Sequence, residues 1–489
     1  MDQAYYTKTI LINLIAVLGL NFYASAQNIE VKGLENDVPT SISLDANGDM
    51  ILAGYTKSFD DGSDQAYLVK IDDRGDVLWK KTMGDIYGDR IFDICIDDDQ
   101  SLFITGESWL GFGGVYGREN MFVAELDEDA NLTNQRSYFG YHRDMGLRIK
   151  EVDHGNHIVV GYTKSMEDKT GEIMIVKVNP SLDTIWKTIL GEPRSVDYGF
   201  DMIESENTYL VIGSIGGFFN SVQDDYLTPK SRMYMAKLDL DGHLLWEKKY
   251  GGEGHDWIEQ AVIAEGGVYA IGSTQSIGNG SFDMLLLKTD LNGDSLFAKS
   301  YGEAHFEHGR SIVYHNHRLF LGGQKKSDAE KMSSAIYLVC TDMDGQVIWE
   351  KTIESTESDK LVEMVLSKDG QSIYCLAQSE HSDTHKDFWL FNMDLNGNIS
   401  TLTDVQLAKN NQVYPNPVST LANIDVADYV RESCKLMIYN EVGQLVSQKQ
   451  SVLSGSVFSF PVTNLNSGFY TYRLDIGDRK RISGKFIVR

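Results

Sequence analysis

Short runs of alternating apolar and polar residues fill most of the chain, and turn signals join them in pairs. Residues 41–56, SISLDANGDMILAGYT, alternate on both sides of an Asn-Gly pair, and residues 66–82, AYLVKIDDRGDVLWKKT, alternate around Asp-Arg-Gly. Period-two alternation indicates half-buried strands, and Asn-Gly between apolar runs is a strong hairpin signal. Together these residues predict four strands in two hairpins.

The second hairpin opens with a phrase that recurs seven times, with starts 51–60 residues apart. This spacing is near the period of propeller blades, and no segment shows sustained helical periodicity. We therefore predict an all-β protein with a seven-bladed β-propeller over residues 27–405. The copies are LVKIDDRG from Leu68, VAELDEDA from Val123, IVKVNPSL from Ile175, MAKLDLDG from Met235, LLKTDLNG from Leu286, LVCTDMDG from Leu338 and LFNMDLNG from Leu390.

The predicted ring needs a strand that closes it, because an open propeller leaves edge strands unpaired. Residues 28–33, NIEVKG, align with the fourth-strand phrase WKKTMG, and residues 399–405 are the other candidate. We favour the amino-terminal strand. A large aromatic residue also recurs in the fourth strand, and we expect it to pack between blades rather than bind a ligand. These aromatics are Trp79, Trp186, Trp246, Phe297 and Trp349.

Two sets of acids repeat with the blades. Segments such as DANGD at Asp45 and DLNGD at Asp290 resemble calcium loops but lack the further oxygen ligands and the distal Glu, so we interpret them as tight turns. The second set follows each preceding strand and should satisfy backbone N–H groups at the blade junctions. It comprises Asp37, Asp89, Asp144, Asp197, Asp256 and Asp359, with His308 in the sixth place.

Composition narrows the classes of partner and compartment. A formal net charge of -27 argues against a nucleic-acid partner. Residues 1–26 have Lys8, an apolar run and a small-residue end at Ala26, as a signal peptide does, and we expect no transmembrane segment after its cleavage. Four cysteines are too few for a disulfide scaffold; buried free thiols are expected, with a Cys340–Cys375 bridge as the alternative.

After a linker at residues 406–411, residues 412–489 form a separate module of short alternating strands with glycine turns. This pattern predicts a small Ig-like β-sandwich. Its motifs are YPNP at Tyr414, Pro415, Asn416 and Pro417, MIYNEVGQLV with Gly443, SGFYTY with Gly468 and Tyr470, and the final KFIVR with Lys485.

In this combination and order, the motifs resemble the carboxy-terminal sorting domain of type IX secretion (Por) in Bacteroidetes. The resemblance implies export through the periplasm by the type IX machinery, with a secreted or cell-surface destination. One departure is that no proline precedes Gly468. From the residues alone, an adhesive sandwich domain remains the alternative.

Function is expected on the face that carries the variable loops, which join strands two and three of a blade or link successive blades. Two of these loops are rich in aromatic residues and glycine, and could present platforms for sugar rings or protein anchors, or fold back over themselves. Their aromatic residues are Trp109, Phe112 and Tyr116 in blade two, and Phe218, Phe219 and Tyr226 in blade four.

Other chemistry is less well supported by the residues. His315-Asn316-His317 falls in a tight turn, and His381 and His385 are weak candidates for metal ligands. The catalytic residues are unknown, and no cofactor is expected. Our interpretation is a non-catalytic binding protein for glycans or proteins. The first alternative is an extracellular polysaccharide hydrolase or lyase, and the less favoured one is a quinone-dependent enzyme.

Overall fold

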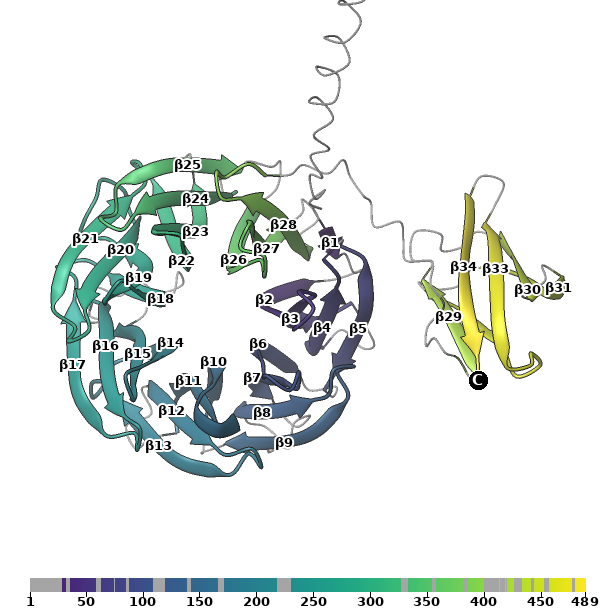
Figure 1. Cartoon of the computed structure of the whole chain (residues 1–489), viewed down its shortest axis with the longest axis horizontal. Coiled ribbons are helices and arrows are strands. Elements are labelled where there is room, and N and C mark those ends of the chain that lie inside the picture. The colour runs from purple at the N-terminus through teal and green to yellow at the C-terminus, as the bar shows by residue number, and fades with distance from the viewer. Residues whose placement is uncertain are drawn as a thin grey trace, which may run out of the picture.

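The chain folds into a ring of seven four-stranded antiparallel sheets and a small carboxy-terminal β-sandwich (Figure 1). No helix among the described residues has the length and apolar character needed to cross a membrane. The computed structural model describes residues 29–31, 36–58, 63–73, 75–84, 88–108, 119–138, 142–165, 171–217, 230–326, 333–353, 358–380, 385–399, 413, 418, 420–425, 433–440, 444–452, 457–476 and 480–489.

Each sheet is one blade, and its strands run from the axis outward in chain order, so the first strands face the axis and the fourth strands form the rim (Figure 1). Blades one to three comprise β2 (Asp37–Leu44), β3 (Met50–Thr56), β4 (Gln65–Ile71) and β5 (Val77–Met83); β6 (Asp89–Ile96), β7 (Leu102–Ser108), β8 (Asn120–Leu126) and β9 (Leu132–Tyr138); and β10 (Asp144–Glu151), the short 3-10 turn η1 (Asp153–Gly155), β11 (His157–Thr163), β12 (Glu172–Val178) and β13 (Thr184–Leu190). Blades four to six comprise β14 (Tyr198–Ser205), β15 (Thr208–Ile215), β16 (Arg232–Asp239) and β17 (Leu244–Tyr250); β18 (Asp256–Ala264), β19 (Gly267–Thr274), β20 (Asp283–Asp290) and β21 (Ser295–Tyr301); and β22 (Phe306–His315), β23 (Arg318–Lys326), β24 (Ala335–Asp342) and β25 (Val347–Ile353).

The seventh blade joins the two ends of the ring. It contains β26 (Ser358–Leu366), β27 (Ser372–Glu380), β28 (Lys386–Asp394) and, on its outer side, β1 (Ile29–Val31). Strand β1 runs antiparallel to β28, with Ile29 opposite Leu390. The prediction of closure by the amino-terminal strand is confirmed. Of the competing segment, Ile399 makes a single bridge to Met393, and the rest lies outside the described residues.

A glycine in the second strand allows the first strand of a blade to bulge. In blade two, Gly106 lies opposite Ile91, directly before the register shift to Asp93. A Cβ at Gly106 would overlap the carbonyl oxygen of Arg90. The same arrangement recurs at Gly54, Gly161, Gly213, Gly272 and Gly323, whereas blade seven has Ala377 in this place.

This close approach makes a testable prediction for Gly106→Ala. The added methyl group must displace the bulged backbone, so we expect the free energy of unfolding to fall by about 1–3 kcal/mol, the usual cost of overpacking. Urea unfolding followed by tryptophan fluorescence measures the change. Gly266→Ala is the control for a turn glycine with nothing within 4 Å of the added Cβ. Gly266 has a φ of +76°, so its variant measures the cost of backbone strain, whereas Gly106 is not among the glycines with positive φ. A loss in Gly106→Ala no larger than that in Gly266→Ala would contradict the prediction.

The aromatic residues of the fourth strands pack between blades, as predicted. Trp186 of β13 contacts Gly242 in the last turn of the next blade, and its Nε1 donates to the carbonyl oxygen of Leu240 at 2.9 Å. Gly242 has a φ of +82°, and a Cβ there would strike the indole ring. Trp246 and Trp349 lie over the equivalent turn glycines of the blades that follow them. The repeated phrase therefore encodes both a turn and the surface against which the preceding blade packs.

The acids at the blade junctions are buried structural groups. Asp37 accepts a hydrogen bond from Thr56, and Asp256 accepts one from Thr274 at 2.5 Å. The prediction of His308 in the sixth place was wrong. Glu307 occupies it, fully buried beside Gly302. It follows Leu286, the start of its repeat, by 21 residues, just as Asp256 follows Met235, so the repeat spacing itself points to Glu307.

A ring of polar side chains, the central polar network, links all seven blades around the axis. Each member directly follows the bulge of its first strand: Ser41, Asp93, Arg148, Asp201, Gln260, Ser311 and Glu363. The Ser41 hydroxyl donates to Asp93 at 2.7 Å and lies 2.8 Å from Glu363, so it joins blades two and seven. Arg148 of blade three donates to Glu363 at 2.7 Å, across the intervening blades. The network therefore ties together blades that are not neighbours in the ring.

Backbone groups reinforce this network at most blade junctions. The carboxylate of Asp93 accepts from the Ile149 amide at 2.7 Å, and that of Glu363 accepts from the Ile42 amide at 3.0 Å. The second contact spans the junction where the two ends of the ring meet. Burial raises the pKa of Asp93 to about 6, although Arg148 opposes the shift.

The cysteines and tight turns follow the sequence-based predictions. All four cysteines are free thiols, so the alternative Cys340–Cys375 bridge is absent. The carboxylate of Asp45 accepts backbone amides of its own turn, and that of Asp290 does the same. Asn316 and His317 have φ values of +49° and +59°, which places the His315–His317 triplet in a tight turn as predicted.

The carboxy-terminal module contains two sheets around one apolar core. Strands β29 (Leu421–Asp425) and β32 (Val457–Pro461) form one sheet; β30 (Ser433–Asn440), β31 (Leu445–Val452), β33 (Gly468–Ile476) and β34 (Lys480–Val488) form the other. Ile424 and Phe460 from the first sheet join Tyr472 and Phe486 from the second in this core. The predicted β-sandwich is confirmed.

Candidate functional site

The variable loops leave the ring at the face where first strands begin and second strands end. In blade two, β7 ends at Ser108 and β8 begins at Asn120; in blade four, β15 ends at Ile215 and β16 begins at Arg232. The loop aromatics Trp109, Phe112, Tyr116, Phe218, Phe219 and Tyr226 lie outside the described residues. The described part of this face is therefore formed by the strand ends that anchor the two loops.

Three aromatic rings stack between blades three and four at this face. Tyr162, near the end of β11, stacks on Tyr198 with ring centroids 4.6 Å apart and planes 13° apart. Tyr198 stacks in turn on Phe200, with centroids 5.7 Å and planes 5° apart. Tyr162 is buried, whereas Tyr198 and Phe200 are half-buried. The stack, here called the aromatic step, therefore runs from the blade interface toward solvent.

Two arginines fix a buried carboxylate beside the blade-two loop. Glu107 is 2% exposed and accepts from Arg90 at 2.8 Å and from Arg143 at 2.7 Å. Arg143 also contacts Glu119 at 2.8 Å, directly before β8. Glu119, the residue directly before β8, is thus ion-paired to Arg143 at the start of blade three. Burial raises the pKa of the Tyr198 hydroxyl, and the positive charge of Arg143 opposes this shift.

A second group of aromatic residues lies on blades five and six. Trp257 contacts Phe282 with centroids 5.1 Å apart and His308 with centroids 5.4 Å apart. His308 and Glu259 approach to 2.5 Å. Burial opposes ionisation of Glu259, but the charges of His308 and Arg310 lower its pKa to about 2. Glu259 is therefore an ion-pair partner at neutral pH and not a proton donor.

The pair of histidines predicted as metal candidates is only partly described by the structure. His385 is half-buried directly before β28, and His381 lies outside the described residues. Among the described residues, the two groups with ligand atoms close enough for a metal are Cys95, Asp97 and His157, and Asp239, Asp241 and His243. Neither contains His385.

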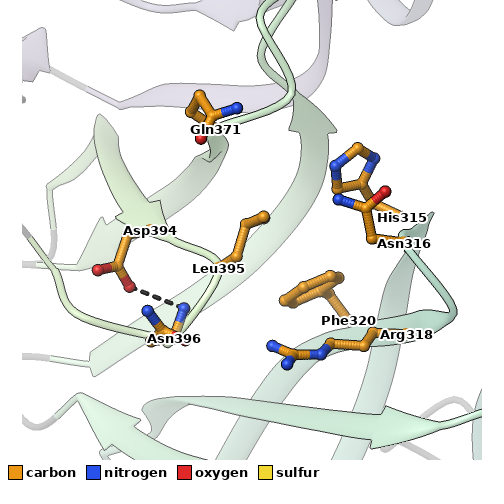
Figure 2. A pocket seen from close by; sticks show the side chains of 8 residues that line it. All are labelled: His315, Asn316, Arg318, Phe320, Gln371, Asp394, Leu395 and Asn396. Carbon is orange, nitrogen blue, oxygen red and sulfur yellow. Dashed lines mark hydrogen bonds between the residues drawn. The ribbon is translucent and has the colours of Figure 1, made fainter.

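A hollow of about 440 Å³ lies on the opposite, tight-turn face between blades six and seven (Figure 2). Its walls include Arg318, Phe320 and the turn residue Asp394. The Asp394 carboxylate already accepts the Asn396 amide at 2.8 Å, as the dashed line in Figure 2 shows. The Asp394 carboxylate is therefore used to stabilise its own turn, so we do not place the functional site in this hollow.

The carboxy-terminal module matches a known protein family. Residues 412–489 match the model for the secretion system C-terminal sorting domain. This module is a type IX secretion sorting domain. The sorting domain implies interaction with the type IX machinery and a secreted or cell-surface location, as the sequence predicted.

The motif residues of the sorting domain occupy different environments. Tyr470 is 8% exposed, stacks on Phe486 at 5.6 Å and donates to the Asn466 carbonyl at 2.7 Å. Lys485 is exposed on β34, and Gly468 begins β33. Tyr470 therefore supports the fold, whereas Lys485 is available to a partner. The motif residues Tyr414, Pro415, Asn416, Pro417 and Gly443 lie outside the described residues.

Solved structures that resemble about three quarters of the chain include β-propellers at low identity. The β-propeller domain of the Trilobed protease from Pyrococcus furiosus aligns at 10% identity and a TM-score of 0.42, covering 78% of this chain and 100% of that one. Sqt1 from Chaetomium thermophilum aligns at 10% identity and a TM-score of 0.44, covering 78% of this chain and 87% of that one. YCF48 bound to D1 peptide aligns at 11% identity and a TM-score of 0.45, covering 75% of this chain and 95% of that one. A search of curated proteins gave no match. These likenesses carry no argument about a ligand.

The aromatic step, the Glu107 cluster and the central polar network were not predicted from the sequence. The signal was present in part: Tyr198 directly follows Asp197, and Asp93, Arg148 and Glu363 recur four residues after the junction acids. The residue type at these positions changes from blade to blade, so the positions do not stand out as part of the repeat.

Proposed function

We propose that this secreted propeller is a non-catalytic binding protein that takes a carbohydrate on its variable-loop face. The observation that carries the proposal is the aromatic step of Tyr162, Tyr198 and Phe200. It lies on blades three and four, on the face where the strands that lead into the two variable loops end at Ser108 and Ile215. Because Tyr198 already stacks on Tyr162 and on Phe200, the half-buried Phe200 at the end of the stack is the ring that would meet the apolar face of a sugar.

The charged groups beside the step support a ligand of neutral, hydroxyl-rich character. Glu107 is satisfied by two arginines, so the cluster carries fixed donors and acceptors without a large uncompensated charge. Such preorganised polar groups around an apolar platform are typical of small-ligand sites. A protein ligand that docks on the same loops is the other outcome that the experiment must distinguish.

The described acids on this face are not placed for hydrolysis. Burial raises the pKa of Glu307 to about 7 and that of Asp37 to about 6, but both side chains are fully buried and out of reach of a substrate. A glycoside hydrolase needs one carboxyl group that holds its proton near neutral pH and a second that is ionised and within reach of the substrate. Glu259 is held ionised by His308 and Arg310, and Glu107 is buried under its arginines. The binding proposal therefore accounts for these residues without a catalytic step.

A glycan and polysaccharide array tests the proposal with the purified chain. We expect retention of a subset of glycans without release of shorter products. Phe200→Ala, and alanine replacement of Trp109, Phe112 and Tyr116, should each weaken binding by about 10–30-fold, the loss expected for an aromatic anchor.

Leu296→Ala is the control for this series, because Leu296 is 58% exposed on the outer strand β21. It should leave retention unchanged. Loss of binding in this variant, or no glycan retained by the parent protein, would contradict the carbohydrate proposal. Product release would replace the binding protein with an enzyme.

A further inference from the structure

Four side chains with metal-binding chemistry meet where blade two packs on blade three, on the tight-turn side of the ring. Cys95 and Asp97 are two residues apart at the end of β6, so they project to the same side. Glu151 and His157 are directly paired between β10 and β11 and share a face of that sheet. The two pairs come from different blades and face each other across the interface.

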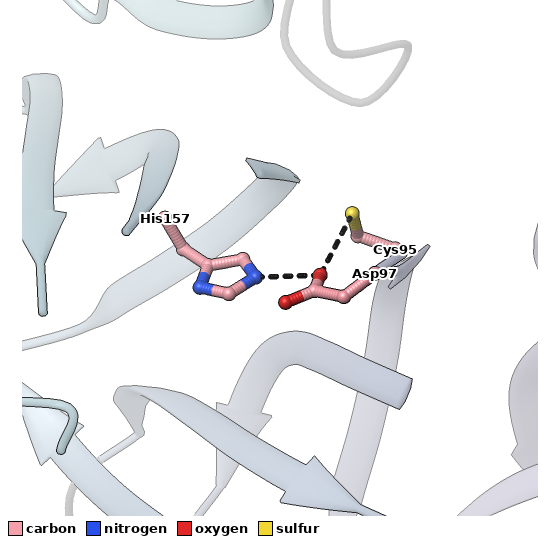
Figure 3. A group of neighbouring side chains, drawn as sticks. All are labelled: Cys95, Asp97 and His157. Atoms are coloured by element: carbon pink, nitrogen blue, oxygen red, sulfur yellow. Dashed lines mark hydrogen bonds and ion pairs between the residues drawn. The ribbon is translucent and has the colours of Figure 1, made fainter. Parts of the chain in front are cut away.

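The distances within this group suit one small cation. His157 Nε2 lies 2.9 Å from Asp97 Oδ1, and Cys95 Sγ lies 3.9 Å from the same oxygen (Figure 3). The ligand atoms of these three residues all lie within 4.8 Å of one another. Tetrahedral zinc, with bonds of about 2.0–2.3 Å, separates its ligand atoms by roughly 3–4 Å. A small adjustment of side chains would therefore place all three around one ion.

The group is held in place by its surroundings. His157 is fully buried and stacks on Phe103 with ring centroids 3.8 Å apart. The Glu151 amide donates to Cys95 Sγ at 3.4 Å, which fixes the thiol beside the second blade. The Glu151 carboxylate interacts electrostatically with both Asp97 and His157. Its carboxylate is not among the ligand atoms that lie within 4.8 Å of one another, so it would have to turn toward His157 to complete the ligand set, with water as the other fourth ligand.

The neighbouring blades show that a positive charge is expected at this position. In blade one the turn acid Asp45 pairs with Lys70 at 2.7 Å, and in blade three Asp153 pairs with Lys177 at 2.6 Å. Blade two has Glu125 where the others have this lysine. The repeat thus supplies its own cation in blades one and three, and replaces it with a further acid in blade two.

We propose that Cys95, Asp97 and His157, with Glu151, bind a zinc ion that clamps blade two to blade three. A thiolate and an imidazole select zinc over calcium or magnesium, which prefer all-oxygen sites. The role is structural, because the ligands come from two adjacent blades and His157 is buried. The second cluster, Asp239, Asp241 and His243, is exposed, and its Asp239 carboxylate accepts the turn amides of Asp241 and His243.

The test begins with metal-free protein from which any affinity tag has been removed. After zinc is added and excess removed by gel filtration, elemental analysis should find one zinc per chain, with a thermal midpoint raised by zinc and lowered again by EDTA. The cobalt-substituted protein should show a thiolate-to-cobalt charge-transfer band. Absence of retained zinc, or of the cobalt band, in the parent protein would overturn the proposal.

Variants assign the ligands. Cys95→Ser should remove the cobalt band. Both Cys95→Ser and Glu151→Gln should weaken zinc binding. For Cys95→Ser the loss of affinity should be at least about 10–100-fold, the range that changes next to metal ligands cause. His243→Ala in the exposed cluster is the matched control and should bind zinc as the parent does. If Cys95→Ser does not fold by circular dichroism, the parent's cobalt spectrum and Glu151→Gln decide. Unchanged binding in Glu151→Gln would remove Glu151 from the ligand set, and unchanged binding in folded Cys95→Ser would overturn the site.

Discussion

Arg148→Met should lower the free energy of unfolding by about 3–5 kcal/mol, because removing one partner of a buried ionic group leaves the others uncompensated. The Arg148 side chain is 18% exposed and contacts Asp93 at 3.1 Å, Glu363 at 2.7 Å and Asp201 at 3.7 Å. Without the guanidinium, three carboxylates share the centre of the ring, with Lys150 on Asp201 alone. Urea unfolding measures the loss.

The loss should depend on pH. Asp93 has a folded-state pKa of about 6, above its ordinary value of 3.8, because burial disfavours its charge. The folded protein therefore binds more protons than the unfolded chain between these values, and the Asp93 contribution to stability falls as pH rises from about 4 to about 6. In Arg148→Met the pKa rises further, so the window extends to higher pH. The variant should lose less stability at pH 5 than at pH 7.5.

Arg310→Met is the matched control for the charge at the centre of the ring. Arg310 also lies on a first strand but is 41% exposed, and it approaches Glu259 at 3.5 Å. Its loss should cost less than the loss of Arg148, because the guanidinium is partly exposed and His308 remains in contact with Glu259. Equal losses in the two variants, or a loss in Arg148→Met that does not change with pH, would show that the central polar network does not carry the predicted energy.

Deleting residues 412–489 should abolish export and leave the propeller in the periplasm. The physical reason is that the sorting domain presents the surface that the type IX machinery reads, and the propeller has its own apolar cores without it. Immunoblots of culture medium, cell surface and periplasm measure the distribution. Protein that still reaches the medium would contradict this prediction.

A point variant separates recognition from folding in the same assay. Lys485→Ala changes an exposed residue of β34 and should reduce export while the domain stays folded. Lys435→Ala, at an exposed position of β30 in the same sheet, is the control and should be exported normally. Equal export of the two variants would remove Lys485 from the recognised surface.

Repetition made the propeller predictable. Seven copies of one phrase, each with a turn and an aromatic residue, specify local hairpins and a shared packing surface, so blade number and blade contacts followed from Trp186 and its equivalents. Closure by residues 29–31 was predictable for the same reason, since their sequence resembles a fourth strand. The sorting domain was predictable from several short motifs in a fixed order.

The candidate sites depended on contacts that no local pattern encodes. Arg148 reaches Glu363 from a blade that is not its neighbour, and Cys95 meets His157 only where two sheets pack. The aromatic step likewise joins Tyr162 to Tyr198 across a blade interface.

The amino-acid sequence by itself determined the strands, their turns, the number of blades and the export module, because each depends on residues close together in the chain or repeated along it. The tertiary structure alone decided the central polar network, the aromatic step and the Cys95–His157 group. Ring closure brings together side chains from opposite ends of the ring, such as Ser41 and Glu363, which are 322 residues apart. Their pairing is set by the circular packing of blades rather than by sequence spacing.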